Sequence, residues 1–216
     1  MLGKEDYLQA FMPDLDRKLH GGLWAVVGIV FAWSYAGCHD RFTWAMEVFP
    51  VALGTAYLLA VYSRWRFSRL VCWLLALHAV VLMVGGHYTY AEVPLFNRLR
   101  DAFHLSRNHY DRLGHFMQGF VPALIAREVL IRKRVVARGG WLNFIAICVC
   151  LALSASYELL EWQTAVWTGE KADAFLGSQG DVWDTQWDMA MALIGASTAL
   201  LLFTRLHDRE LDRLSA

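Results

Sequence analysis

Residues 70–86, LVCWLLALHAVVLMVGG, contain no charged side chain. Four more stretches share this property: residues 21–37, 50–63, 141–157 and 189–204. A helix needs about 20 mostly apolar residues to cross the core of a bilayer. Most of these stretches reach that length once flanking aromatic or long basic side chains are added. Hydrophobic residues make up 57% of the 216-residue chain, above the roughly 45–50% of soluble domains. Length and composition together therefore predict transmembrane helices rather than a soluble helical protein.

A sixth, more polar stretch covers residues 113–131. It carries His115 and Gln118 near its start and Arg127 and Glu128 near its end, around an apolar middle. This distribution suits a helix that is buried among other helices. The sequence thus predicts an all-α, polytopic bundle of about six spans in one domain, residues 1–216. The predicted spans are residues 20–38, 46–63, 70–88, 113–131, 141–160 and 187–205.

The distribution of Lys and Arg predicts the orientation. If the N-terminus is inside and the number of spans is even, 14 of the 20 basic residues fall on inner segments and 6 on outer segments. Cytoplasmic segments are enriched in Lys and Arg, so both termini are expected in the cytoplasm. The first apolar run lacks a small-residue cleavage pattern and follows an acidic start, which predicts a retained span rather than a signal peptide.

Composition also limits the partners. The formal net charge is zero, which gives no reason to expect nucleic acid as a partner. Membrane lipids are the expected partners of the apolar helices. The four cysteines form no CxxC pair and no zinc spacing. The sequence leaves the oligomeric state open.

Two long connections, residues 88–112 and 158–187, fall on the outer side in this topology. Both are rich in aromatic residues and poor in Ser, Pro and Gly repeats, so we expect them to pack as a cap over the helix ends. A short helix over residues 95–103 is expected within the first of them.

The first polar cluster lies where the fourth span begins. If that helix starts near Asp111, then Asp111, His115 and Gln118 share one face at i, i+4 and i+7. An Asp and a His four residues apart can share a metal ion or form an acid–base pair in which the carboxylate orients the imidazole. The alternative is that Asp111 caps the helix and His115 makes a buried hydrogen bond.

The second polar cluster lies near the outer end of the fifth span. Glu158 and Glu161 are i, i+3 neighbours, and two carboxylates at that spacing repel unless a proton, a cation or an arginine lies between them. Trp162 and Trp167 are typical of a membrane interface, so Glu161 could simply face water. Glu158 follows the charge-free run of residues 141–157, which makes that explanation weaker for it.

The third polar cluster leads into the last span. Asp181, Asp184 and Asp188 fall at i, i+3 and i+7, on one face if this segment is helical. An acid near a helix N-terminus is favoured by the helix dipole, which could account for Asp181 and Asp184. Asp188 lies two turns further along and needs another explanation.

A hard divalent cation held by carboxylate oxygens and one imidazole would relieve the repulsion among these acids. The expected metal ligands are Asp181, Asp184, Asp188, Glu158 and His115. The expected catalytic residues are His115, Asp111 and Glu158. The expected substrate-binding residues are Arg107, Arg112, His87, Tyr90, Gln118 and Glu161.

These clusters resemble the YjdF-like family of uncharacterised bacterial inner-membrane proteins. The matching motifs are His87-Tyr88-Thr89-Tyr90 and residues 107–119, 154–162 and 175–189. The resemblance implies a multi-pass protein of the bacterial inner membrane. A more distant resemblance is to VanZ-like proteins, associated with glycopeptide (teicoplanin) resistance. It rests on the order Asp111/His115, Glu158, Asp184/Asp188 and Gly195, with Asp188 standing where the VanZ-like pattern has Asn.

Three functions are compatible with these features. The first is a metal-dependent membrane hydrolase or transferase that acts at the outer leaflet on a lipid or lipid-linked envelope substrate. The second is an accessory membrane protein without chemistry, whose acids are each matched by an arginine or a helix end. The third is a cation- or proton-coupled transporter. The last is disfavoured because the inner halves of the spans are mostly apolar, with His78 as the main exception.

Overall fold

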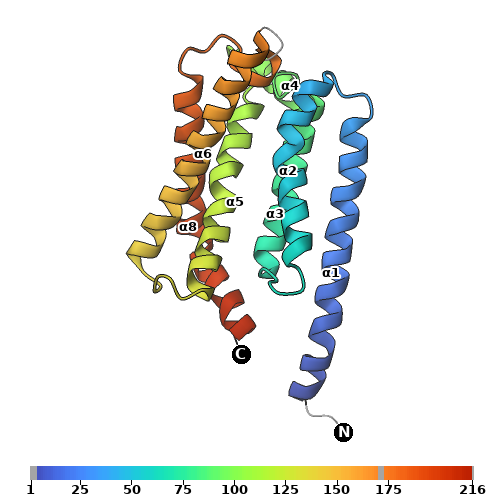
Figure 1. Cartoon of the computed structure of the whole chain (residues 1–216), viewed down its shortest axis with the longest axis vertical. Coiled ribbons are helices and arrows are strands. Elements are labelled where there is room, and N and C mark those ends of the chain that lie inside the picture. The colour runs from blue at the N-terminus through green and yellow to red at the C-terminus, as the bar shows by residue number, and fades with distance from the viewer. Residues whose placement is uncertain (1–3, 170–172, 216) are drawn as a thin grey trace.

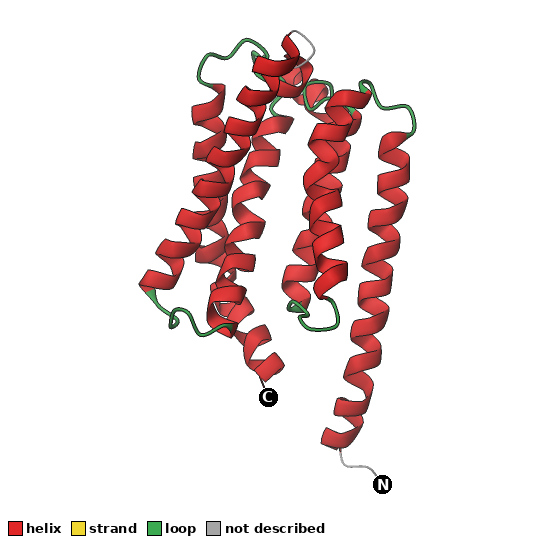
Figure 2. Cartoon of the chain, in the orientation of Figure 1, coloured by secondary structure: helices red, strands yellow, loops and turns green. Residues whose placement is uncertain are grey.

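The computed structural model describes the backbone of residues 4–169 and 173–215 and the side chains of residues 18–169 and 175–214. All regular elements of this part of the chain are helices, as the sequence predicts (Figure 2). In chain order they are α1 (Lys4–Tyr35), α2 (Arg41–Val61), α3 (Arg69–His87), α4 (Pro94–Phe103), α5 (Tyr110–Arg132), α6 (Gly140–Thr168), α7 (Asp173–Leu176) and α8 (Asp184–Ser215).

The long helices form two groups of three. In the first group, α1 and α2 both pack against α3, and in the second, α6 and α8 both pack against α5. Contacts between α3 and α5 join the groups. Both chain termini lie at one end of the bundle, here called the termini end, and α4 lies at the opposite end, here called the cap end (Figure 1).

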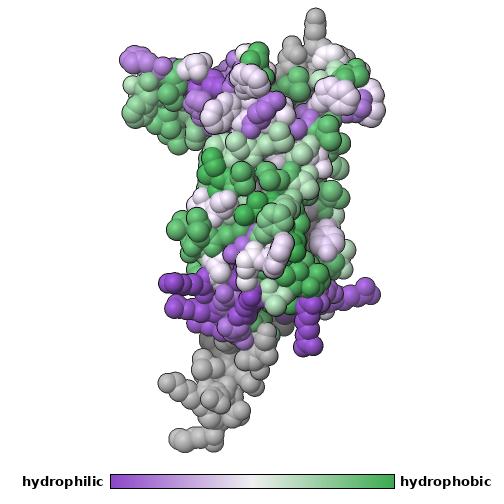
Figure 3. Space-filling model, turned by 90° about the vertical axis from the view of Figure 1, so that its left-hand side faces the viewer, coloured by the Kyte–Doolittle hydropathy of each residue, from purple (hydrophilic) through white to green (hydrophobic). Residues whose placement is uncertain are grey.

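Four helices of the described residues are long and apolar enough to cross a membrane: α2, α3, α6 and Asp184–Leu214 of α8. The other two predicted spans, residues 20–38 and 113–131, fall on α1 and α5, which are not among these four. In the surface view, a hydrophobic band separates polar residues at the two ends (Figure 3). The chain is therefore a multi-pass helical protein, and the count of six spans stays a prediction.

The polar stretch read as a buried helix is α5. Arg127 and Glu128, the charged pair in its last two turns, are 1% and 0% exposed.

The contact between α5 and α8 is close because each helix has a glycine at the interface. A Cβ built on Gly119 would overlap the backbone of Ala192, and one built on Gly195 would overlap the backbone of Phe116. Small residues allow this approach between membrane helices.

A buried polar network ties the two helix groups together at the termini end. Glu128 of α5 accepts hydrogen bonds from the backbone N–H of Ser68 (3.0 Å), from the Ser68 hydroxyl (2.7 Å) and from Arg132 (2.7 Å). His207 Nε2 of α8 lies 3.1 Å from Glu128. Arg127 donates to Asp208, also of α8, across 2.7 Å. The charges of α5 at this end therefore have partners on α3 and α8.

The cap expected over the helix ends is present in part. The short helix expected over residues 95–103 is α4, Pro94–Phe103. The segment before the last span contains α7, which packs against α2 and α6. The two long connections therefore meet the same end of the bundle, where the polar clusters lie.

Candidate functional site

The two long connections are clamped together by Asn108 and Gln179. The backbone N–H of Asn108 donates to Gln179 Oε1 (3.0 Å), and Gln179 Nε2 donates back to the Asn108 carbonyl (2.9 Å). The Asn108 side chain is fully buried and donates to the carbonyl of Val93 and to Asn97 Oδ1. This clamp fixes the start of α5 against the start of α8. It was not expected from the sequence, because hydrogen-bond partners 71 residues apart leave no periodic signal.

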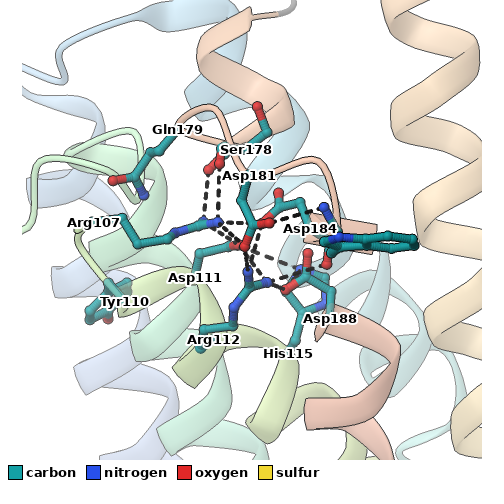
Figure 4. Close-up of polar contacts among 12 residues, drawn as sticks. Arg107, Tyr110, Asp111, Arg112, His115, Ser178, Gln179, Asp181, Asp184 and Asp188 are labelled. Atoms are coloured by element: carbon teal, nitrogen blue, oxygen red, sulfur yellow. Dashed lines mark hydrogen bonds and ion pairs between the residues drawn. The ribbon is translucent and has the colours of Figure 1, made fainter. Parts of the chain in front are cut away.

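Two buried arginines bring the aspartates together (Figure 4). Arg107 donates to Asp184 Oδ1 across 2.5 Å and to the carbonyls of Gly177 and Ser178. Arg112 pairs with Asp184 at 2.9 Å and also donates to Asp188. The arginine side chains are 5% and 10% exposed. Their guanidinium groups therefore face aspartates, and binding of an anionic head group by them stays a prediction.

Asp181 does not share a helical face with the other two aspartates, because α8 begins at Asp184. Asp181 instead lies in the turn before α8, where its Oδ1 accepts a hydrogen bond from the backbone N–H of Trp183 (2.9 Å). Its Oδ2 lies 3.1 Å from Arg112 and 3.7 Å from Arg107. The expected helical register is wrong here, but the arginines still gather all three aspartates.

His115 is the hub of the remaining contacts. Its Nδ1 lies 2.9 Å from Gln118 Oε1, which can only accept, so this nitrogen carries the proton and donates. Its Nε2 lies 3.5 Å from Asp111 Oδ1 and 3.8 Å from Asp188 Oδ1. The pairing of Asp111 with His115 on one face of α5, expected from the i, i+4 spacing, is present.

Asp111, His115 and Asp188 are a buried group that could hold a metal ion. Each offers one ligand atom, and these atoms lie within 4.8 Å of one another. Asp111 is shared between two partners, since its Oδ1 faces His115 and its Oδ2 lies 3.4 Å from Arg107. Two carboxylates and one imidazole, the imidazole held by a neighbouring hydrogen bond, are a donor set that suits a divalent ion such as Mn²⁺ or Zn²⁺. The residues present therefore fit a divalent cation.

A cavity of about 240 Å³ lies beside this group. Its lining combines four acids with apolar side chains such as Trp162 and Val182 and with two hydroxyl side chains; the acids are Glu158, Glu161, Asp181 and Asp184, and the hydroxyls are Ser178 and Thr185. Glu158 Oε1 lies 3.8 Å from His115 Nδ1 and has no hydrogen-bond partner among the described residues. Both glutamates, predicted as one pair near the end of a span, are 8% exposed. The cavity thus combines acidic and apolar walls.

One acidic residue of this region was missed from the sequence. Glu47 of α2 is 7% exposed, and its Oε2 accepts a hydrogen bond from the Tyr157 hydroxyl of α6 (3.2 Å). Glu47 was overlooked because it is a lone acid in an apolar helix, without another charged residue at helical spacing. Tyr90 lies next to it, with its ring held between Gly85 and Gly114, where a Cβ would clash. The expectation that Tyr90 joins the acidic region fits this position.

His87 has other neighbours. Its Nδ1 lies 2.9 Å from the carbonyl of Ser34, and its ring stacks on Trp33 with centroids 4.4 Å apart. The contacts of the His87 ring are therefore mainly to α1.

His109, just before α5, is a further histidine of the cap end. Burial, with the positive charges of Arg107 and Arg112, lowers the pKa of His109 below its ordinary value. His109 therefore adds little positive charge near neutral pH.

Carboxylates outnumber arginines in this region. Four aspartates share two arginines, and Glu47, Glu158 and Glu161 have no arginine partner among the described side chains. Uncompensated buried carboxylates are costly unless protons or cations balance them. The site therefore has an excess of acidic groups that a bound cation would offset.

The comparisons with known proteins agree with the resemblance drawn from the motifs. Residues 19–209 match the family described as "Predicted membrane protein (DUF2238)". The chain is 48% identical over 185 residues to the inner membrane protein YjdF of Escherichia coli (strain K12), an alignment that covers 86% of this chain and 88% of that protein. No solved structure matches. These matches do not show the resemblance to VanZ-like proteins, which stays a prediction. The family match and this relative show that the chain is an integral membrane protein of the DUF2238 family.

Proposed function

We propose that this chain is a membrane-embedded, metal-dependent hydrolase or transferase that acts on a lipid or lipid-linked envelope substrate. The observation that carries the proposal is the arrangement of His115. Its Nδ1 is engaged by Gln118, and its Nε2 faces Asp111 and Asp188 at 3.5 and 3.8 Å. Metal-binding histidines are commonly oriented in this way, with the second ring nitrogen held by a hydrogen bond.

In this proposal Asp111, His115 and Asp188 would hold the ion, which supplies a Lewis acid that polarises a carbonyl or phosphoryl oxygen. Glu158 is the group best placed to accept a proton, because its Oε1 lacks a hydrogen-bond partner and the residue lines the cavity. Arg107 and Arg112 act as positioning residues that hold the aspartates in place.

The substrate class is inferred from the cavity walls. The lining combines acids such as Glu158 and Asp184 with apolar side chains such as Trp162 and Leu176. Trp162, at 61% exposed, also lies on the surface of a helix suited to cross a membrane. A molecule with a polar group and an apolar tail matches such a lining better than a wholly polar metabolite.

Binding of Mn²⁺ by the purified full-length protein tests the first half of the proposal. Electron paramagnetic resonance should detect a bound ion in the wild type and a large loss of affinity in Asp188→Asn and His115→Gln. Asp101→Asn is the matched control, because Asp101 is an exposed acid of α4 at the same end. Incubation with a total envelope lipid extract, followed by mass spectrometry, should then reveal a product whose formation requires Mn²⁺ and Glu158. Wild-type protein that binds Mn²⁺ no better than Asp188→Asn would contradict the proposal.

A second candidate, an accessory protein without chemistry, is favoured by one specific observation. Asp188 Oδ1, which faces His115, also accepts the hydrogen bond from Arg112. A guanidinium group in that position competes with a cation for the same oxygen. If the arginines only stabilise the structure of the cap end, the Asp188→Asn variant should be less stable than the wild type, and the two proteins should not differ in ion affinity.

Transport is not favoured by the interior of the bundle. Between the two polar ends, the described core contains Val121, Leu124 and Leu200 with other apolar side chains. A transport path needs polar groups along the whole membrane thickness. The acids of the cap end are therefore better suited to chemistry on one side.

A further inference from the structure

A second cavity lies in the helix group of α1, α2 and α3, and no acidic side chain lines it. It has a volume of about 190 Å³ and is lined mainly by aliphatic and aromatic side chains of α1, α2 and α3. The helices α1 and α2 both pack against α3 but make few contacts with each other, and Figure 1 shows α1 standing apart from α2. Side chains of all three helices line this cavity, here called the groove.

The groove has unfilled space at a position where the sequence offers no side chain. Gly54 of α2 lines it, and a Cβ built on Gly54 meets no atom within 4 Å. The volume is below the roughly 300–1,000 Å³ of sites for drug-sized molecules. A narrow, flexible alkyl chain suits such a space better than a compact ligand.

Polar side chains gather mainly at one end of the groove, with Thr55 and His78 as polar residues in its middle. The residues nearest the termini end are His20, Tyr62 and Arg66, whereas the far end is formed by apolar side chains such as Val27 and Leu82. On α2 the lining runs from Pro50 to Tyr62, which at 1.5 Å per residue is about 18 Å. One leaflet of a bilayer has a hydrocarbon depth of about 15 Å, half of the usual 30 Å. The groove therefore has the length and polarity of one lipid in one leaflet.

The charge at the mouth points to an anionic head group. Arg66 is exposed, and its guanidinium lies over the Tyr62 ring at 5.1 Å. Among the described side chains, Arg66 has no carboxylate partner within ion-pair distance. Its neighbour Arg64 is also exposed and carries the same charge. Basic pockets between membrane helices bind acidic lipid head groups.

We propose that this groove binds one anionic phospholipid, with an acyl chain between α1 and α2 and the phosphate at Arg66. The proposal does not depend on the metal site, because the two sites share no residue and lie in different helix groups. Its role is to fill the space that α1 and α2 leave between their side-chain contacts at the two ends, His20–Tyr62 and Ser34–Trp44.

Native mass spectrometry of the full-length protein, loaded with equal amounts of phosphatidylglycerol and phosphatidylethanolamine, tests the proposal. The wild type should retain one molecule of phosphatidylglycerol in preference to phosphatidylethanolamine. Arg66→Gln should lower that preference about fivefold, the value of one basic residue near an anionic lipid. Arg205→Gln, an exposed arginine of α8 outside the groove, should leave it unchanged.

Filling the groove gives an independent test of the acyl-chain part. Gly54→Leu should reduce retention of both lipids, whereas Gly28→Leu should not. Gly28 is the matched control, because it is also an exposed helical glycine with open space around it but does not line the groove. Thermal unfolding of both variants checks that each is folded. Equal retention of the two lipids by the wild type, or equal behaviour of Gly54→Leu and Gly28→Leu, would overturn the proposal. A dimer that Gly54→Leu abolishes would assign the groove to a second copy of the chain instead.

Discussion

Tyr157 of α6 donates a hydrogen bond to Glu47 of α2 across 3.2 Å, and this bond joins the two helix groups at the cap end. At the termini end, Glu128 of α5 receives two hydrogen bonds from Ser68, which precedes α3. Each end of the interface between the groups therefore carries a buried glutamate with a partner from the other group. These three bonds fix how the acidic site of one group meets α2 and α3.

The Tyr157–Glu47 bond should be measurable as a coupling. In a double-mutant cycle with Tyr157→Phe and Glu47→Leu, which removes the acceptor, the free energies of unfolding should show a coupling of about 0.5–1.5 kcal/mol, the usual size of one such bond. The control cycle pairs Tyr157→Phe with Glu92→Gln, an exposed acid of the same end, and should show none. Additive effects in the first cycle would mean that the bond does not stabilise the contact.

Arg112 should be essential for stability. Arg112→Gln leaves Asp188 without its arginine partner and Asp184 with Arg107 alone, and breaking a buried ion pair on one side typically costs about 3–5 kcal/mol. Thermal or denaturant unfolding in detergent measures the loss. Arg100→Gln removes an arginine that pairs with Asp101 at the surface, so it should cost less than about 1 kcal/mol. Similar losses in the two variants would show that the Arg112 network is not a tight buried pair.

Much of the fold could be predicted because its signals are local. Charge-free runs of sufficient length mark the helices, and the i, i+4 spacing of Asp111 and His115 places both on one face of α5. Turn chemistry was harder to interpret. Asp181 was assigned to the helical face of Asp184 and Asp188, but its side chain accepts the Trp183 N–H and ends up in the preceding turn.

The long-range part of the site could not be predicted from one sequence. Nothing near Glu47 in the chain shows that Tyr157, 110 residues later, will lie against it. The arginines carried a similar ambiguity, because a guanidinium can bind a substrate phosphate or an aspartate of the same chain. In the structure, Arg107 and Arg112 are almost inaccessible to solvent and surrounded by aspartates. Their partners are therefore aspartates of the same chain.

The close contact between α5 and α8 should depend on glycine. Gly119→Ala would push a methyl group into the backbone of Ala192, and overpacking of this kind costs about 1–3 kcal/mol. Gly28→Ala, where a Cβ meets open space, should be neutral or slightly stabilising. Unfolding temperatures of the two variants give the comparison. An unchanged Gly119→Ala protein would argue against the tight α5–α8 packing.

The orientation predicted from the basic residues can be tested with fusions. Green fluorescent protein joined to the C-terminus should fluoresce, because both termini are expected in the cytoplasm. Alkaline phosphatase joined after Leu105, in the exposed loop between α4 and α5, should be active because that end is expected outside. An inactive phosphatase together with an active one at the C-terminus would reverse the assignment and place the acidic site on the cytoplasmic side.

Gln118 should control ion binding without touching the ion. Its Oε1 holds the Nδ1–H of His115 and so keeps the Nε2 lone pair toward Asp111 and Asp188. Loss of such a supporting hydrogen bond typically lowers metal affinity about 10–100-fold. Gln118→Ala should therefore weaken Mn²⁺ binding by that factor, whereas Gln118→Glu, which keeps an acceptor oxygen, should restore most of it. Gln186→Ala, at an exposed position of α8, is the control and should bind as the wild type does. If Gln118→Ala lost only stability and kept its Mn²⁺ affinity, His115 would be a partner of the aspartates rather than a metal ligand.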